Sequence, residues 1–303
     1  MRSEIYQNIT NQIIADLEEG ELTWLKPWGS EDNSAQMMRP LRHDGQFYNG
    51  INILILWSVI SEHKFTSPYW MTFRQAIAYG AHVKKGERGT SVVYANSFTN
   101  IETNVDGEEE EYVVPFLKHY TVFNVDQITD LPDRFYVHQQ PVISENMRIQ
   151  NAEDFFSLLN VEIQHSGDNA YYSPKKDFIK MPDFTFFHSP EAYYATLAHE
   201  LIHWTAHENR LNRGTSVKSP SKEEYAKEEL IAELGSAFIC ADLNLKPLPG
   251  KDHAAYIQSW LTILKEDKKM IFKASAAAQR AVDYIKKLTA RNNDDQKLYA
   301  SAA

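Results

Sequence analysis

The spacing of apolar residues predicts helices at both ends of the chain. Residues 4–19 place isoleucine or leucine at every fourth position, which repeats one helix face, and Gly20 ends the pattern. Residues 253–264 and 268–288 are amphipathic in the same way. Residues 51–61 fit a buried helix or a buried strand, because a Leu/Ile-rich stretch of this length does not discriminate between the two.

Strand patterns occur in two separate parts of the chain. Residues 91–99 and 112–123 predict two long strands joined by the acidic loop 108–111. Residues 161–164 and 178–181 predict a smaller sheet further along. The chain therefore belongs to the α+β class.

Helical patterns fill most of the remainder. Thr72 and Gln75 form a capping box that opens a short helix, and residues 151–159 and 223–243 predict two more helices. We expect a boundary after Pro132. The resulting division is a mixed α/β N-terminal domain at 1–132, a linker at 133–149, a mostly helical C-terminal domain with a small sheet at 150–290, and a disordered tail at 291–303.

The sequence His199-Glu200-Leu201-Ile202-His203 carries the strongest chemical signal. Histidines four residues apart lie one above the other on a helix face, where they can occupy two corners of a zinc tetrahedron. Glu200 stands where metallopeptidases with this motif keep their general base. Ser189 is a suitable N-cap and Pro190 suits the first helical position, so the motif falls on a helix.

A catalytic zinc usually has three protein ligands and one open position. One family with this motif places a third histidine six residues after the second, but Asn209 occupies that position here. A carboxylate from the following helix is the other solution. We assign Glu229 as the third ligand and Glu233 as a group that orients a histidine, with Glu228 as the alternative ligand.

The motif implies metal-assisted hydrolysis. Zinc lowers the pKa of a bound water to about 7 and polarises a carbonyl. Glu200 would accept the proton of the water and deliver it to the leaving amine. Tyr225, Tyr193 and His207 are candidate donors to the oxyanion, and the sequence does not choose among them.

Composition narrows the class of protein. The 303 residues are 43% hydrophobic and 24% charged, as in a soluble globular protein. Cys240 is the single cysteine, which excludes an internal disulfide and fits a reducing cytoplasm. Charged residues within 1–20 argue against a signal peptide, and no apolar stretch is long enough to cross a membrane. We therefore expect a cytoplasmic protein.

The net charge of −10 argues against a protein that coats nucleic acid over its whole surface, but one segment is locally basic. Residues 1–132 contain ten Lys and Arg against eighteen Asp and Glu, whereas residues 63–100 have a net charge of +4. Aromatic residues are interleaved with these charges. Such a segment fits either a groove for single-stranded nucleic acid or a core with a solvated turn.

Several blocks of sequence resemble ArdC-type antirestriction proteins. SPEAYYATLAHELIHWTAHENRLNR at 189–213 and YAKEELIAELGSAFIC at 225–240 are similar to the zincin-like domain of that family. The N-terminal blocks lie at 24–28, 48–54, 70–76, 83–86 and 120–127. The resemblance implies an N-terminal domain that binds single-stranded DNA and a C-terminal metallopeptidase-like domain. It also implies a protein of conjugative plasmids that protects incoming DNA from host restriction.

The resemblance favours DNA binding by the basic segment. We predict that Lys84, Lys85 and Arg88, with Arg74, contact phosphates, and that Trp70 or Phe73 stacks on a base. Further candidates are Trp24, Trp28, Arg39, Arg42 and Tyr48. The expected partners are single-stranded DNA, double-stranded DNA as a second candidate, and a protein substrate at a Zn²⁺ site. The alternatives are a cytoplasmic zinc peptidase that acts on a protein regulator, or a DNA-binding protein whose zinc is purely structural.

Overall fold

The computed structural model describes residues 2–19, 38–103, 109–136, 145–214, 221–245 and 253–301. Trp24 and Trp28, which were candidates for DNA binding, lie outside these ranges, as do residues 137–144 of the predicted linker. The α-helices are α1 (Arg2–Glu18), α2 (Ile51–His63), α3 (Phe73–Ala78), α4 (Glu145–Ser157), α5 (Pro190–Thr205), α6 (Lys222–Asp242), α7 (His253–Glu266) and α8 (Met270–Ser301). The strands are β1 (Leu41–Arg42), β2 (Tyr69–Met71), β3 (His82–Val83), β4 (Thr90–Thr103), β5 (Glu109–Asn124), β6 (Ile128–Thr129), β7 (Ile163–His165), β8 (Tyr171–Ser173) and β9 (Phe178–Met181). The α+β class is confirmed.

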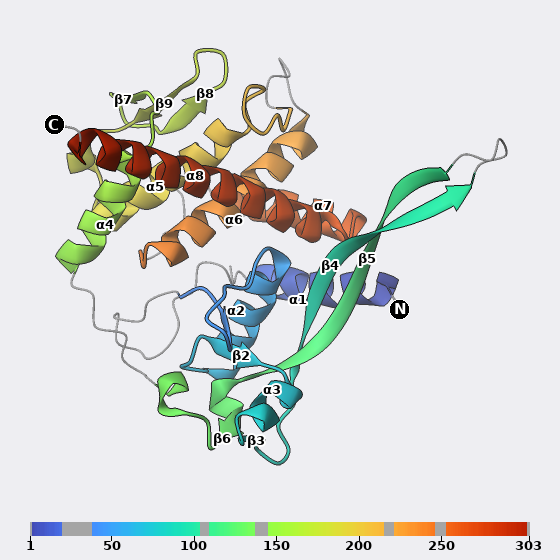
Figure 1. Cartoon of the computed structure of the whole chain (residues 1–303). Coiled ribbons are helices and arrows are strands. Elements are labelled where there is room, and N and C mark those ends of the chain that lie inside the picture. Colours follow the sequence, from blue (N-terminus) through green and yellow to red (C-terminus); the bar gives the residue numbers. More distant parts are fainter. Residues whose placement is uncertain are drawn as a thin grey trace.

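The N-terminal half is built around a sheet with strand order β1-β2-β5-β4. Its two long strands, β4 and β5, pair antiparallel along their full length and project from the body of the molecule (Figure 1). Both predicted strands are therefore present, each longer than its pattern indicated. The ambiguous stretch at 51–61 is helix α2, which ends at the left-handed Lys64. The predicted capping box of α3 is also confirmed, since Thr72 and Gln75 make both of its hydrogen bonds.

The C-terminal half consists of helices α4 to α8 and a small sheet with strand order β7-β9-β8. Strand β8 was not predicted, because three residues of alternation are too few to stand out. Helix α6 begins with a capping box between Ser221 and Glu224 and is buried along most of its length. Helix α8 runs across the whole half in Figure 1.

One hydrophobic core extends across both halves. Helix α1 lies against α7, where Thr10 Oγ1 donates a hydrogen bond of 2.6 Å to the Lys268 carbonyl. Arg39 is 4% exposed and reaches from the N-terminal half to Asp242 on α6, at 3.0 Å, and to Gln279 on α8, at 2.7 Å. Arg39 was a candidate for DNA binding, and that prediction is corrected. Its guanidinium is buried and binds Asp242 and Gln279, and so connects the two halves.

Helix α8 continues to Ser301 and so includes residues 291–301 of the tail for which the sequence predicts disorder. The residues after Arg291 are polar, which suggested disorder. Most of them nevertheless tolerate a helix, and neither proline nor glycine interrupts residues 291–301. Among the residues that the structure describes, no helix combines the length and the apolar character needed to cross a membrane.

Helices α5 and α6 approach closely at Gly235. A methyl group built there would lie 2.6 Å from Ile202 Cδ1 and 2.7 Å from Ile202 Cγ1, and Ile202 is fully buried. We predict that Gly235→Ala destabilises the fold, because overpacking costs about 1–3 kcal/mol while the better helix propensity of alanine returns about 1 kcal/mol. Urea unfolding followed by circular dichroism measures the change.

The matched control is Ile202→Val, which removes the nearest atom, Cδ1. Alone it should cost about 0.5–1.5 kcal/mol, and it should cost less in the Gly235→Ala background. A Gly235→Ala protein as stable as the wild type would show that the two helices can separate freely.

Candidate metal centre

Helix α5 presents the two histidines of the HExxH motif on one face. The Ser189 side chain accepts a hydrogen bond from the Ala192 amide, and Pro190 occupies the first turn, as the sequence predicts. His199 Nε2 and His203 Nε2 lie 3.1 Å apart, with the ring planes inclined at 75°. Both nitrogens face helix α6.

Glu229 on α6 completes a three-residue cluster. Its carboxylate oxygens lie 3.4 Å from His199 Nε2 and 3.5 Å from His203 Nε2, and the ligand atoms of the three residues all fall within 4.8 Å of one another. Two imidazole nitrogens and one carboxylate oxygen are donors that suit zinc and other divalent transition metals. The residues present therefore fit a metal ion.

The outer nitrogen of each histidine faces a second carboxylate. Glu233 Oε1 lies 3.5 Å from His199 Nδ1, and Glu228 Oε1 lies 3.4 Å from His203 Nδ1. Such contacts fix the ring orientation of a histidine and the nitrogen that carries its proton. Among the three glutamates considered from the sequence, Glu229 faces both Nε2 atoms, whereas Glu228 and Glu233 lie behind the rings.

Arg213 holds Glu228 in place. Its guanidinium contacts both Glu228 oxygens, at 2.6 and 3.1 Å, and donates to the Ile202 carbonyl and to Thr205 Oγ1, each at 2.7 Å. Sequence reasoning missed Arg213, because its role depends on how the turn after α5 folds back. Arg213 therefore binds Glu228, and Glu228 in turn contacts His203.

Glu200 is 7% exposed and lies on the histidine helix, where its charge helps raise the pKa of both histidines. Of the three candidate oxyanion donors, Tyr225 lies nearest the cluster, since its hydroxyl contacts Glu229 and lies 3.2 Å from that of Tyr256. Tyr193 is engaged with His165 at 2.9 Å, and His207 accepts the Asn209 amide. The geometry therefore favours Tyr225.

The carboxylates change the protonation of the histidines. Burial lowers the pKa of His203, but hydrogen bonds with Glu228 and Glu229 outweigh this effect and raise the pKa to about 10. The pKa of His199 is also raised, since Glu229 and Glu233 outweigh its burial. Burial raises the pKa of Glu233 to about 7. Without a metal, the cluster therefore holds protons at neutral pH.

The predicted DNA-binding turn is exposed. Lys84, Lys85, Arg88 and Arg74 all have exposed side chains, and the ring of Phe73 is 53% exposed. The turn connects β3 to β4. It is held by Gln127, whose side-chain amide donates to Glu87 at 2.8 Å and to the Arg88 carbonyl at 2.9 Å.

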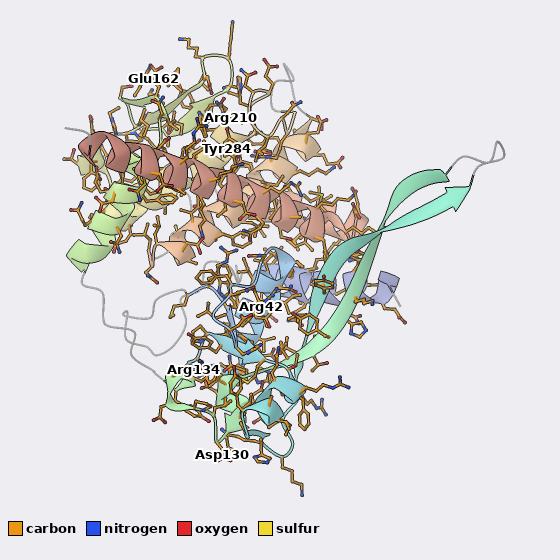
Figure 2. The ribbon with its side chains drawn as sticks, in the orientation of Figure 1. Arg42, Asp130, Arg134, Glu162, Arg210 and Tyr284 are labelled. Carbon is orange, nitrogen blue, oxygen red and sulfur yellow. The ribbon has the colours of Figure 1, made fainter. Side chains whose placement is uncertain are left out.

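Other residues named for DNA binding lie inside the fold. Trp70 on β2 is fully buried, because β2 lies between β1 and β5 and its ring faces the core. No face of this ring is open to a base, so the stacking role predicted for Trp70 is corrected, and Phe73 remains the candidate for it. Tyr48 is 2% exposed and is corrected for the same reason. Arg42, labelled in Figure 2, is half-buried, with its guanidinium 5.5 Å from the centre of the Tyr48 ring.

Two family models match this chain. One, described as the N-terminal domain of the anti-restriction factor ArdC, matches residues 3–123. The other, described as a zincin-like metallopeptidase, matches residues 150–277 and so includes the metal centre.

Solved structures and curated proteins agree with these matches. The metal-free crystal structure of the antirestriction protein ArdC from plasmid R388 is 41% identical, with a TM-score of 0.79, and the match covers 94% of this chain and 98% of that one. The Mn(II)-bound structure of the same protein is 40% identical over the same coverage, with a TM-score of 0.76. The protein y4eC of Sinorhizobium fredii is 38% identical over 93% of this chain and 92% of its own length. DNA primase TraC of Escherichia coli is 34% identical, but this chain spans 27% of its length.

The raised histidine pKa predicts that metal uptake releases protons. A protonated imidazole cannot be a ligand, so at neutral pH the metal must displace the His203 proton. The affinity of the site for the metal therefore rises as the pH rises toward about 10, and it falls as the pH falls. Calorimetric titration of chelator-treated protein with zinc chloride, in buffers of different ionisation enthalpy, counts the protons. We expect about one or more per metal.

His188, which is exposed and outside the cluster, provides the control. His188→Ala should leave the proton count unchanged. The prediction would be contradicted if the enthalpy of zinc binding did not depend on the buffer and the affinity for zinc did not depend on pH.

Proposed function

Because this chain belongs to the ArdC family of antirestriction proteins, we propose that it binds single-stranded DNA and protects incoming plasmid DNA from restriction in the recipient cytoplasm. We further propose that its C-terminal domain holds a zinc ion in a hydrolytic site. The observation that carries the proposal is the cluster of His199, His203 and Glu229, which lies within a match covering nearly the whole of the R388 protein.

The exposed turn between β3 and β4 supports DNA binding. Lys84, Lys85 and Arg88 are exposed on a compact turn in which Gly86 adopts the left-handed conformation, and Lys84 Nζ also donates to the Asp126 carbonyl at 2.7 Å. Phe73 offers a half-exposed ring from the neighbouring helix α3. Basic groups that track phosphates, together with a ring that stacks on bases, bind a single strand without sequence preference.

The metal centre supports hydrolysis. His199, His203 and Glu229 would hold the ion, and His199 and His203 are oriented by Glu233 and Glu228. When bound, zinc activates a water molecule and polarises a carbonyl. Glu200 would accept the proton of the attacking water and pass it to the leaving amine, and Tyr225, whose hydroxyl contacts Glu229, would donate to the developing oxyanion.

The two roles of the acidic residues can be separated by substitution. Glu229→Ala should lose the metal, because it removes the third ligand, whereas Glu200→Gln should keep it and lose hydrolysis. Glu233→Gln should weaken metal affinity by about 10–100-fold, the usual effect of losing a group that orients a ligand. Elemental analysis and chelator competition measure both quantities.

His207→Ala is the control, since His207 lies outside the ligand cluster. If Glu200→Gln also lost its metal, Glu200 would be a ligand rather than the base. If protection of transferred DNA survived in Glu200→Gln, antirestriction would be independent of hydrolysis, and the zinc would be structural.

The basic turn makes a separate prediction. Each phosphate contact on a single strand contributes about 0.7 to the slope of log affinity against log salt. Lys84→Ala with Lys85→Ala should therefore flatten the slope by about 1.4. Phe73→Ala should instead weaken binding by about 1–3 kcal/mol with an unchanged slope, because stacking involves no counterion release. Fluorescence anisotropy of a labelled oligothymidylate across a salt series provides the measurement, and a wild-type slope in the lysine variant would place the DNA elsewhere.

A further inference from the structure

The most basic stretch of the chain lies in the C-terminal half, outside the predicted DNA-binding turn. Residues 268–291 contain seven Lys and Arg against the single acidic Asp283, a net charge of +6 in a chain of −10. The stretch begins just before α8 and covers most of that helix. A local positive surface of this size in an acidic protein restricts where a polyanion can approach.

The helix gathers four of these charges on one face. At 100° per residue, Lys273, Arg280, Lys287 and Arg291 fall within about 40° of arc and extend over about 27 Å. All four side chains are exposed. Lys286, by contrast, is only partly exposed and pairs with the buried Asp242 at 2.6 Å. We call the four exposed residues the α8 stripe.

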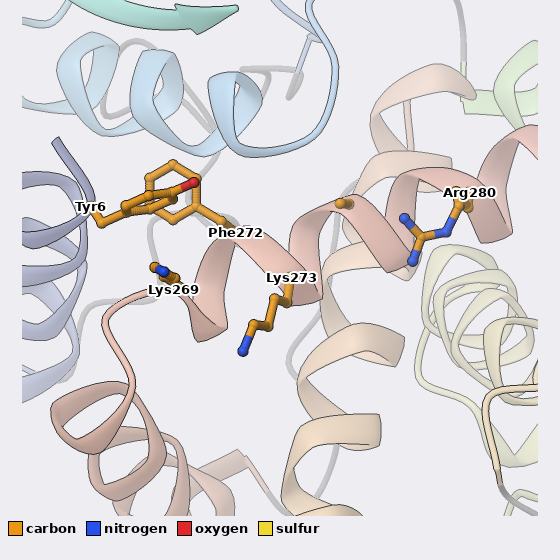
Figure 3. Close-up of a pocket in the computed structure, with 6 residues that line it drawn as sticks. Tyr6, Lys269, Phe272, Lys273 and Arg280 are labelled. Carbon is orange, nitrogen blue, oxygen red and sulfur yellow. The ribbon is translucent and has the colours of Figure 1, made fainter. Parts of the chain in front are cut away.

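The first turn of the stripe borders a pocket of about 360 Å³. The pocket is lined by Tyr6, Lys269, Phe272, Lys273, Ala276 and Arg280, a set that contains three cations and no acidic side chain. In Figure 3 the Tyr6 ring on α1 lies beside the Phe272 ring on α8, and Lys273 and Arg280 lie further along α8. The Tyr6 ring meets Phe272 edge to face at 4.6 Å, and Lys269 Nζ lies 5.6 Å from the Tyr6 ring centre.

One salt bridge at this pocket neutralises little. Lys273 Nζ lies 2.7 Å from Asp267 Oδ2, with both side chains largely exposed, and exposed pairs of this kind exchange readily with other partners. Further along the same face, Tyr284, labelled on α8 in Figure 2, is half-buried and lies 6.4 Å from Trp204. Aromatic rings therefore accompany the cations at two points.

We propose that the α8 stripe and the Tyr6 pocket form a second contact surface for single-stranded DNA, on helix α8 of the C-terminal half, with one aromatic ring contributed by α1. The stripe would follow the phosphates, and the pocket would receive a base against the Tyr6 ring. This inference rests on the proposed DNA binding and extends it beyond the N-terminal domain. Helix α8 and strand β3, which leads into the basic turn, lie in different parts of the molecule (Figure 1), so the two surfaces are separate contacts.

Single-stranded DNA fits this surface better than an acidic protein does. An acidic polypeptide would pair with the same cations, but it offers no flat ring for an aromatic pocket. A single strand combines regularly spaced negative charges with exposed base faces, and its binding uses basic grooves and stacking rings together.

The test compares two double variants with the same loss of charge. Arg280→Ala with Lys287→Ala removes two cations of the stripe, and Lys175→Ala with Lys176→Ala removes two exposed cations from the turn between β8 and β9. Anisotropy with a labelled oligothymidylate long enough to span both surfaces is measured across a salt series. The stripe variant should flatten the salt slope by about 1.4, and the control should keep the wild-type slope.

Each outcome separates the inference from the proposed function. If the wild type does not bind the oligonucleotide, the proposed DNA binding fails. If the wild type binds and both double variants keep its slope, DNA binding stands and the α8 surface is overturned. If both variants flatten the slope equally, a long-range field rather than contact is responsible, and the α8 surface is again overturned.

The pocket is tested through Tyr6. Tyr6→Leu should weaken oligothymidylate binding by roughly 5- to 150-fold at constant salt slope, while Tyr6→Phe should bind as the wild type does. Inorganic polyphosphate, which has no bases, should be insensitive to Tyr6→Leu. Equal weakening of both ligands would overturn the base pocket, as would poly-glutamate binding as tight as that of the oligonucleotide.

Discussion

The metal centre depends on how closely α5 and α6 approach each other. The buried side chain of Ile202, on α5, packs directly against Gly235 of α6, where a larger residue would clash. Next to it, Ser236 Oγ donates to the Ala195 carbonyl of α5 at 3.0 Å. This contact holds the helices close enough for the short carboxylate arms of α6 to reach both rings of the histidine pair. Because none of the residues in this contact is a metal ligand, the ligands can be arranged before an ion arrives.

The electrostatics of the centre follow from that packing. The structure places four glutamates, Glu200, Glu228, Glu229 and Glu233, in a buried or nearly buried region around two imidazoles. Burying charges is costly unless they are paired. Arg213 offsets part of the negative charge, and protons on the histidines offset more, which is why the pKa of His203 reaches about 10. A divalent cation can take over the role of these protons, so the charges that stabilise the metal-free site also set the pH dependence of its affinity.

The parts of the site that follow local rules could be predicted from the sequence. A helix repeat places His199 above His203, a Ser-Pro start fixes the beginning of α5, and a second acidic helix offers carboxylates. The parts set by tertiary contact could not. Arg213 reaches Glu228 only because the turn after α5 folds back. The sequence around Arg39 does not show that Asp242, far along the chain, lies beside it in the fold.

The same limit explains the errors on aromatic and basic residues. A tryptophan beside cations suits a stacking face or a core equally well, and only the neighbours of β2 decide that Trp70 is buried. The basic character of α8 is present in the sequence, but acidic residues elsewhere in the C-terminal half balance it, because residues 133–303 contain 21 Lys and Arg against 23 Asp and Glu. A net charge summed over a whole domain does not reveal basic residues that a helix places together on one face.

The union of the two halves gives the two basic surfaces a fixed relation. Arg39 ties the loop before β1 to α6 and α8, Thr10 ties α1 to the residues before α8, and the core is continuous between them. A DNA strand that contacts both the β3–β4 turn and α8 would therefore bind two surfaces whose relative position is already fixed. No entropy would be lost in ordering one domain against the other. Two linked contacts on one rigid body raise the effective concentration of the second once the first has formed. If DNA binds both surfaces as proposed, it would lie along the half of the molecule that carries the metal centre, and a protein that approaches the DNA would be brought close to that centre.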